Sequence, residues 1–236
     1  MKTIEISDAL YGKIVERRSK PEEDIDSILK RIFNVRLRGI SEPKKIVFVG
    51  EAAVGKSTIR KTFFEYFNPQ DLLDNSLEPT RGLEFFQYDL FDLNCSVLDT
   101  SGQELRDWIQ NQQEEAFSEA DYIVFVASAP DFNKIRAEIY NLLQEITLLA
   151  NFYAQDIIVA LFIHKIDLLA QEDLDDFITE CREYHRQFEK GEETDIPLFF
   201  TSIKSDFLSR LNIAFMKLFR IDSLILPDYK KYLNDF

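Results

Sequence analysis

The chain runs Ile46-Val47-Phe48-Val49 and then Gly50-Glu51-Ala52-Ala53-Val54-Gly55-Lys56-Ser57-Thr58, and this stretch decides its fold. Four β-forming residues in a row predict a strand that is buried on both faces. The glycine, four residues, glycine, lysine and serine that follow have the spacing of a phosphate-binding loop, or P-loop. An amphipathic helix is expected next, and its apolar face would carry Ile59, Phe63, Phe64 and Phe67. Strand, loop and helix thus follow in the order that nucleotide binding requires.

The residue types in this loop suit the chemistry of phosphate. Glycines let backbone N–H groups curl around a phosphate, and the positive end of the helix that opens at Gly55 points toward it. Lys56 adds a point charge, and the Ser57 hydroxyl can ligate Mg²⁺. We therefore expect the residues from Gly50 to Thr58 to bind a nucleoside polyphosphate with Mg²⁺.

Composition indicates a folded, acidic protein. The 236 residues are 45% hydrophobic and include 21 Phe, which is enough for a sizeable core. The net charge is −14, and residues 1–44 carry 10 Lys and Arg against 8 Asp and Glu, which leaves 18 against 34 for the rest. This balance argues against nucleic acid or an anionic membrane as a partner of the main domain. Cys95 and Cys181 are too few for a disulfide framework, so we expect buried free thiols and a cytoplasmic location.

The sequence predicts no membrane anchor. No apolar run reaches the roughly 18 residues of a membrane span. The chain begins Met-Lys rather than Met-Gly, and it ends Leu-Asn-Asp-Phe, without a prenylation cysteine.

The first forty residues predict a small strand-helix-helix unit. Thr3–Ile6 alternates as a short strand does, Ser7 can cap a first helix, and Pro21 opens a second one. The second helix repeats apolar residues at helical spacing, namely Ile25, Ile28, Leu29, Ile32 and Phe33. The pattern resembles a ribbon-helix-helix subunit, a family in which two copies pair their strands and intertwine their helices. We expect residues 1–40 to form such a dimerisation module, and the stretch from Gly39 to Pro43 to be a linker.

Two other interpretations of this unit stay open. A DNA-reading member of that family would point Thr3, Glu5 and Ser7 at base edges, and a glutamate beside phosphates disfavours that role. The two helices could instead form a local hairpin docked on the main domain. Nucleic acid is therefore a disfavoured partner.

The next two segments carry residue types that suit Mg²⁺ and a γ-phosphate. Thr80 lies in a loop ahead of an aromatic strand predicted over Leu83–Leu90, where its hydroxyl could be a second magnesium ligand. A further strand, Cys95–Leu98, leads into Asp99-Thr100-Ser101-Gly102-Gln103-Glu104. Asp99 could hold Mg²⁺ through water, Gly102 could present its N–H to the γ-phosphate, and Gln103 could orient the attacking water.

The rest of the chain alternates strands and helices. We predict strands over Tyr122–Val126, Ile157–Ile163 and Pro197–Phe200, and helices over Ile135–Leu149, Leu174–Phe188 and Phe207–Phe219. The fold class that this alternation indicates is α/β, with a doubly wound, mostly parallel, six-stranded sheet that binds its ligand at the carboxyl ends of the strands. The small strand-helix-helix unit would precede it.

Two short motifs at strand ends indicate a guanine base. His164-Lys165-Ile166-Asp167 resembles the guanine-reading Asn-Lys-x-Asp signature, with His in place of Asn. The Asp167 carboxylate can accept hydrogen bonds from the ring N–H and the exocyclic amine of guanine, which adenine does not offer. Lys165 would lie along the ring. Thr201-Ser202-Ile203 resembles the loop whose backbone meets guanine O6, which makes Ser202 and Ile203 candidate contacts.

From about Lys44 to about Phe219, these segments resemble a small GTPase. Phe162–Leu168 and Phe200–Ile203 are most similar to the Rag branch, in which a His opens the base-reading motif. The resemblance implies a GTP-binding domain over residues 44–222, a tail over residues 223–236, and GTP or GDP with Mg²⁺ as cofactors. Two features depart from that branch. Only a short segment follows the last helix, where Rag proteins carry a pairing domain. The sequence of the loop from Asp99 to Glu104 resembles the corresponding loop of Ras and Arf proteins rather than that of Rag proteins.

The first hypothesis for function is a guanine-nucleotide switch that hydrolyses GTP slowly. No arginine stands two residues ahead of Thr80, where an arginine finger within the chain would lie, so an effector or GTPase-activating partner is expected. The alternatives are a nucleotide-locked assembly scaffold paired through the N-terminal module, and a nucleotide-gated DNA-binding regulator. Pairing through residues 1–40 would give a homodimer or a heterodimer with a related GTPase.

Overall fold

The computed structural model describes residues 44–75, 77, 78, 80, 83–90, 93–100, 114, 117–153, 157–192 and 194–219. For residues 83, 89, 90, 93–96 and 98–100 it describes the backbone alone. The predicted module over residues 1–40, Gly102, Gln103 and the predicted tail lie outside the described residues. The chain divides into two compact units, and the larger one, Lys44–Tyr88 with Cys95–Phe236, holds the site and is treated by itself.

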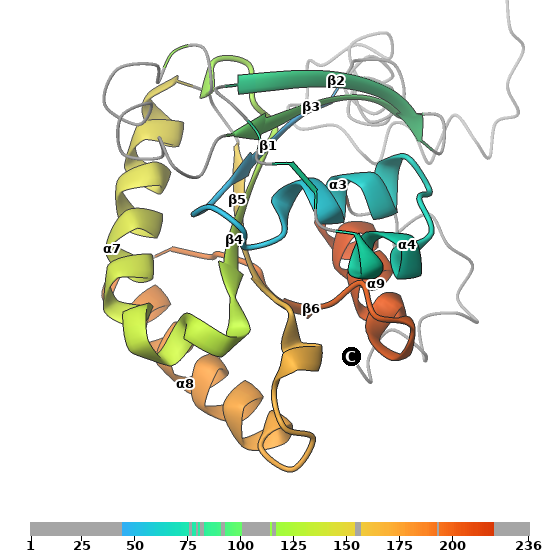
Figure 1. The fold of residues 1–236 in the computed structure, drawn as a ribbon. Coiled ribbons are helices and arrows are strands. Elements are labelled where there is room, and N and C mark those ends of the chain that lie inside the picture. Colours follow the sequence, from blue (N-terminus) through green and yellow to red (C-terminus); the bar gives the residue numbers. More distant parts are fainter. Residues whose placement is uncertain are drawn as a thin grey trace, which may run out of the picture. The chain divides into compact units, whose positions relative to one another are not determined.

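The described strands form one sheet in the order β2-β3-β1-β4-β5-β6 (Figure 1). Their bounds are β1 Lys44–Val49, β2 Leu83–Leu90, β3 Leu93–Thr100, β4 Tyr122–Ser128, β5 Ile158–His164 and β6 Leu198–Thr201. The pairs β1–β3, β1–β4, β4–β5 and β5–β6 are all parallel. β2 and β3 follow each other too closely for a crossover, so that pair is antiparallel. The predicted α/β class with a mostly parallel sheet is confirmed.

Helices cover both faces of this sheet. They are α3 Lys56–Phe64, α4 Pro69–Asp74, α7 Ala129–Tyr153, α8 Leu174–Glu192 and α9 Leu208–Leu218, with short 3₁₀ turns η1 Ile166–Leu168 and η2 Ser205–Phe207. Figure 1 shows α7 and α8 on one face, and α3 and α9 on the other with α4 beside α3. α8 shows how such a helix packs on the sheet through an apolar side. Its buried residues recur at helical spacing and form one stripe; they are Leu174, Phe177, Ile178, Cys181 and His185.

β1 is the centre of the core. Ile46, Val47, Phe48 and Val49 are all 0% exposed, because helices cover this central strand on both sides. On the α3 face, Phe48 meets Phe64 and Phe215 edge to face, with ring centroids 6.3 and 6.2 Å apart. This aromatic packing fixes α3 on the strand that precedes it, and so fixes the loop between them.

Cys181 lies in this core as a free, buried thiol, as predicted for it. Burial raises the pKa of the thiol to about 12, so Cys181 is a packing residue rather than a nucleophile. The side chain of Cys95 lies outside the described residues.

Several details of the predicted helices were wrong. α3 ends at Phe64, so Phe67 does not belong to its apolar face and is 48% exposed. The stretch after it contains α4, a helix that was not predicted, in which the Asn68 side chain accepts a hydrogen bond from Gln70 N at 3.1 Å and Pro69 occupies the first turn. α7 begins at Ala129 rather than Ile135, immediately after β4, because Pro130 is tolerated in a first helical turn.

None of the helices in the described part of the chain is both long and apolar enough to span a membrane.

Candidate nucleotide-binding site

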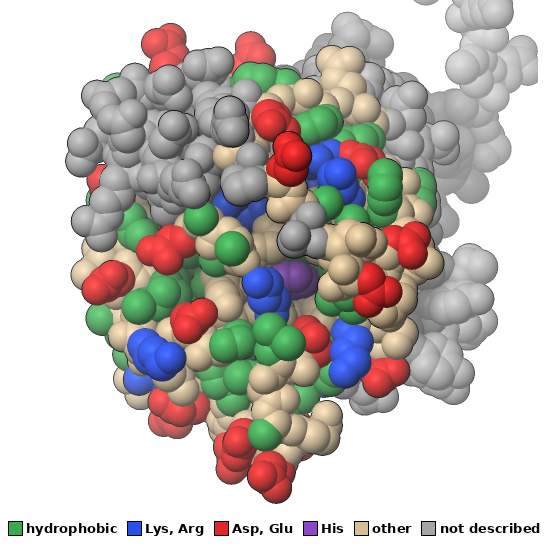
Figure 2. Space-filling view, in the orientation of Figure 1, with side chains coloured by type: hydrophobic (Ala, Val, Ile, Leu, Met, Phe, Trp, Pro, Cys, Tyr) green, Lys and Arg blue, Asp and Glu red, His purple; other side chains and the backbone are tan. Residues whose placement is uncertain are grey.

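A cavity of about 490 Å³ lies where the loops that follow β1, β5 and β6 meet. Figure 2 shows this face of the molecule, where a histidine and a basic side chain lie next to each other in a hollow. Its volume falls within the range of cofactor pockets. The cavity is lined by Ala52, Ala53, Gly55, Lys56, Ser57, Thr58, Leu72, Leu73, Leu77, Glu78, Thr80, His164, Lys165, Asp167, Leu168, Ser202 and Ile203.

The loop after β1 has the backbone of an anion-binding turn. Gly50 has a φ of 144°, and a Cβ there would lie 2.2 Å from the Val126 carbonyl oxygen of β4, so only glycine fits. Gly55 precedes the first turn of α3 with a φ of 108° and gives it no side-chain cap. The described first turn holds Lys56 and no acidic residue. A cation at the positive end of a helix is unfavourable by itself, and an anion bound there reverses the sign.

The Lys56 ammonium is held inside this loop. The side chain is only 6% exposed, and Nζ donates to the carbonyl oxygens of Gly50 and Glu51, each at 2.8 Å. A buried positive charge is costly unless an opposite charge or several acceptors compensate it. The arrangement therefore places a charge-assisted donor at the centre of the loop, next to the open end of α3.

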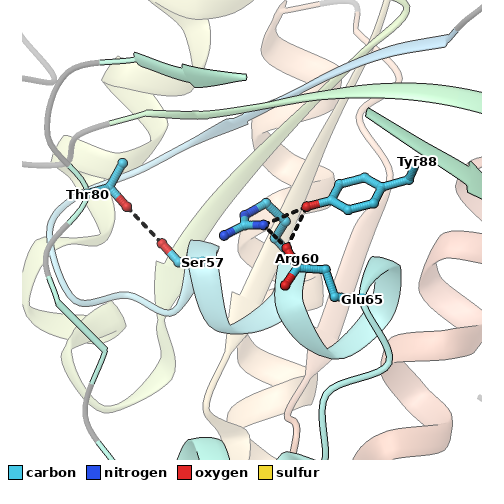
Figure 3. Close-up of polar contacts among 5 residues, drawn as sticks. All are labelled: Ser57, Arg60, Glu65, Thr80 and Tyr88. Atoms are coloured by element: carbon cyan, nitrogen blue, oxygen red, sulfur yellow. Dashed lines mark hydrogen bonds and ion pairs between the residues drawn. The ribbon is translucent and has the colours of Figure 1, made fainter. Parts of the chain in front are cut away.

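Two hydroxyls meet at the edge of the cavity. Ser57 Oγ, on the first turn of α3, lies 3.0 Å from Thr80 Oγ1, and Figure 3 shows the two side chains pointing at each other. Mg²⁺ prefers octahedral oxygen ligands at 2.0–2.1 Å, which puts neighbouring ligands about 2.9 Å apart. The two hydroxyls therefore fit adjacent positions around one magnesium ion.

His164 joins the base motif to the phosphate loop. It is 2% exposed, and its Nδ1 lies 3.0 Å from the Thr201 hydroxyl at the end of β6. The other edge of the ring packs against Gly55, where a Cβ would lie 2.6 Å from Cδ2. Burial, and then the nearby Lys165 charge, lower the pKa of His164 to about 3, so the ring is neutral. It fills the space between Gly55 and β6 and is held by its contact with the Thr201 hydroxyl.

Lys165 makes a second connection between the same two segments. Its Nζ donates to the Ala53 carbonyl oxygen at 2.6 Å. Both residues have positive φ values, 65° for Lys165 and 59° for Ala53, which side-chain-bearing residues adopt rarely. Such backbone strain persists where surrounding contacts enforce it, often at binding sites.

Asp167 is held in place by the loop after β6. Ser202 Oγ donates to Asp167 Oδ1 at 2.5 Å, and Lys204 N donates to Ser202 Oγ at 2.9 Å. Asp167 lies within η1, and α8 begins only at Leu174, so the carboxylate does not cap that helix. One carboxylate oxygen is thus fixed by Ser202, and Asp167 lines the cavity as an acceptor of set orientation.

The remaining candidate residues divide into three groups. Gly50, Glu51 and Val54 belong to the loop but do not line the cavity. Asp99 is described by its backbone alone, in β3 opposite Phe48 of β1. Gly102 and Gln103 lie outside the described residues.

The apolar part of the cavity wall was not predicted from the sequence. Leu72, Leu73 and Leu77 line it from α4 and the segment after it, and Leu168 lines it beside the base motif. The available signals were Asn68 and Pro69, a helix cap and a first-turn proline, which would have placed the two adjacent leucines of α4 next to the loop.

Taken together, a parallel sheet, a glycine-cornered loop that leads into a helix and a base motif at the end of a neighbouring strand define the P-loop G-protein class. Residues 45–225 match the family model for the Gtr1/RagA G protein conserved region. The match spans well over half of the chain, and the chain therefore belongs to the Gtr1/RagA family of G proteins. The predicted membership of the small GTPase superfamily, in its Rag branch, is confirmed.

A solved structure supports the fold alone. The crystal structure of a bacterial selenocysteine-specific elongation factor, EF-Sec, matches with a TM-score of 0.54 and 17% identity. The match covers 76% of this chain and 29% of the elongation factor chain. No curated protein matches the sequence.

Proposed function

We propose that the chain is a magnesium-dependent guanine-nucleotide switch that hydrolyses GTP slowly. The observation that supports this most is the single cavity of about 490 Å³ in which the P-loop, Thr80, the His164–Asp167 motif and the loop at Ser202 meet. These four segments are far apart in the sequence. Each one suits a different part of the same ligand.

The P-loop would bind the phosphates. The start of α3 and the Lys56 ammonium belong to the same loop, and both attract negative charge. On phosphate binding, Lys56 would exchange one of its carbonyl acceptors, Gly50 or Glu51, for a phosphate oxygen. Ser57 and Thr80 would bind the magnesium ion directly, and Asp99 would bind it through a water molecule. Bound Mg²⁺ neutralises phosphate charge.

The base would be selected by Asp167. Its carboxylate only accepts hydrogen bonds at neutral pH, so it fits the two donors of guanine and leaves adenine unpaired. Lys165 and Leu168 on one side, and the leucines of α4 on the other, would provide the apolar walls for the ring and the ribose. Ser202 and Ile203 would provide backbone contacts.

Hydrolysis would depend on Gln103, which would orient the attacking water, and on Gly102, whose N–H would meet the γ-phosphate. Position 78, two residues ahead of Thr80, holds Glu78 rather than an arginine. A slow intrinsic rate and a GTPase-activating partner follow from that.

The wider organisation is also part of the proposal. Residues 1–40 would be a ribbon-helix-helix-like dimerisation module, residues 44–222 the GTP-binding domain, and residues 223–236 a tail. The module would pair the chain with a second copy or with a related GTPase in the cytoplasm. Effector and activating partners would then meet the nucleotide domain.

Identification of the co-purified nucleotide tests the proposal directly. Mass spectrometry of the full chain, denatured after gentle purification, should find GDP or GTP. Titration of the emptied protein should give a much higher affinity for GTP than for ATP in the presence of Mg²⁺. Equal affinity for the two nucleotides would overturn the assignment of guanine, and binding of neither would overturn the switch.

A further inference from the structure

A buried arginine lies behind the nucleotide site and does not line it. Arg60, on α3, is only 4% exposed, which is rare for arginine without charge compensation. Its Nη1 donates to the Tyr88 hydroxyl at 2.6 Å and to the Glu65 carboxylate (Figure 3). The guanidinium also lies over the Phe86 ring, 3.6 Å from its centroid. Arg60 thus joins α3 to two side chains of β2.

Tyr88 completes a closed network of polar groups. Its hydroxyl donates to Glu65 Oε1 at 2.6 Å while it accepts from Arg60. Its ring stacks on Phe64, with centroids 5.4 Å apart, and on Phe86, at 6.3 Å. Burial, and then the hydrogen bond to Glu65, raise the pKa of Tyr88 to about 12, so the hydroxyl keeps its proton at neutral pH. We name Arg60, Glu65 and Tyr88 the β2 clamp.

Among the described residues, the segment that runs from Thr80 into β2 contacts α3 near both ends of the helix. Thr80 meets Ser57 on the first turn of the helix, and Tyr88 meets Glu65, which caps its last turn. The first contact is a single bond between two hydroxyls in the nucleotide cavity. The second is a half-buried ion pair, in which Arg60 is buried and Glu65 is partly exposed, with two further hydrogen bonds and ring stacking outside the cavity. Of the two contacts, only the first lies in the cavity, so bound Mg²⁺ and phosphate would act directly on the first alone.

We propose that the β2 clamp positions Thr80 for magnesium by holding β2 on α3. Arg60, Glu65 and Tyr88 are positioning residues, and they act through Thr80 rather than on the nucleotide. The inference rests on the proposed function, because it assigns Thr80 to Mg²⁺. It adds that the affinity of the site for magnesium is set partly by a network that lies outside the cavity.

Tyr88→Phe is the sharpest change, because it removes the hydroxyl and keeps the ring that stacks on Phe64 and Phe86. Tyr140→Phe is its matched control. Tyr140 is buried where Tyr88 is half-buried, and the Tyr140 hydroxyl bonds His185 Nδ1 at 3.0 Å on the opposite face of the sheet. Each variant removes one hydroxyl and keeps its ring. Tyr88→Phe loses the hydrogen bonds to Arg60 and Glu65, and Tyr140→Phe loses the one to His185, so a loss of general stability would appear in both variants.

Dissociation of a fluorescent, non-hydrolysable GTP analogue from the full chain is the first measurement. The rate is taken in EDTA and in millimolar Mg²⁺, and the ratio reports the contribution of magnesium. We expect Tyr88→Phe to reduce this ratio by about tenfold or more, because the hydroxyl makes hydrogen bonds to two charged groups, Arg60 and Glu65. The rate in EDTA should stay close to that of the wild type. Tyr140→Phe should keep the wild-type ratio.

A double-mutant cycle tests whether Tyr88 affects magnesium binding through Thr80. Thr80→Ala should itself lower the magnesium ratio, and Thr80→Ala combined with Tyr88→Phe should lower it no further. Additive losses would overturn the inference, because Tyr88 would then act independently of Thr80.

Hydrogen exchange of the nucleotide-free chain gives a readout without magnesium. Amides of β2, Leu83–Leu90, should exchange faster in Tyr88→Phe than in the wild type, and Tyr140→Phe should leave them unchanged. Unaltered exchange and an unaltered magnesium ratio in Tyr88→Phe would overturn the inference while GTP binding by the wild type persists. Failure of the wild-type chain to bind the analogue would instead overturn the proposed function.

Discussion

The ring of His164 occupies the space that a side chain at Gly55 would need. A Cβ on Gly55 would lie 2.6 Å from His164 Cδ2 and 3.0 Å from Nε2. The ring has little freedom to move, because it is buried and its Nδ1 is bonded to Thr201. The glycine that begins the phosphate-binding helix and the histidine that opens the base motif are therefore fitted to each other, so the two halves of the cavity pack directly against one another.

Gly55→Ala should accordingly damage both stability and nucleotide binding. The new methyl group clashes with a fixed ring, and the φ of 108° is strained for alanine. We expect a loss of roughly 2 to 5 kcal/mol in the free energy of unfolding, measured by urea denaturation.

Gly191→Ala is the matched control for that change. Gly191 lies near the end of α8, and no described atom lies within 4 Å of its Cβ position. Alanine there should be neutral or should stabilise the chain by up to about 1 kcal/mol. Equal effects of the two substitutions would contradict the close fit of Gly55 and His164.

His164 should make the stability of the chain depend on pH. Burial lowers its pKa in the folded chain to about 3 from an ordinary value of 6.5, so between these values the unfolded chain binds a proton that the folded chain does not. This contribution is present above pH 6.5 and is lost as the pH falls toward 3, with a slope that rises to about 1.4 kcal/mol per pH unit once the unfolded histidine is fully protonated. Urea unfolding of the wild type between pH 6.5 and 5.5 measures it. His164→Asn, which has no titrating ring, should show a shallower slope, and equal slopes would argue for a solvated histidine.

Asp167→Asn should change the base preference. The amide oxygen can still accept from Ser202, so the loop should keep its shape, while the amide nitrogen becomes a donor. We expect a large loss of GTP affinity and a gain for xanthosine nucleotides, which carry a carbonyl where guanine has its amine. Competition titration with GTP, xanthosine triphosphate and ATP measures both effects. A variant that kept its preference for GTP would show that the carboxylate does not contact the base.

Local pattern was enough to predict most of the sheet and the P-loop. β1 is a run of four β-formers buried on both faces, and glycine spacing places the loop directly after it, so neither depends on distant contacts. Leu83–Leu90 was predicted with its observed bounds. α4 was missed because it is short and none of its described residues is buried, which leaves no apolar period to detect.

The relationships within the site could not be predicted from sequence, because they join distant residues. The packing of His164 on Gly55 and the bond from Ser202 to Asp167 depend on which strands are neighbours. Arg60 has no local feature that separates it from a solvated helical arginine, and its burial follows only from the docking of β2 on α3. Tertiary contact, rather than residue type, determines these roles.

Gln103→Leu should separate hydrolysis from binding. If Gln103 orients the attacking water, the contact forms mainly in the transition state, so its loss should lower the single-turnover rate by about tenfold or more and leave GTP affinity nearly unchanged. Gln144→Leu is a suitable control, because Gln144 is on α7 and donates to Glu192 at 2.5 Å, away from the cavity. The control should keep both the rate and the affinity of the wild type. A Gln103→Leu variant that hydrolyses GTP at the wild-type rate would favour a nucleotide-locked scaffold, in which the bound nucleotide supports the fold and is not turned over.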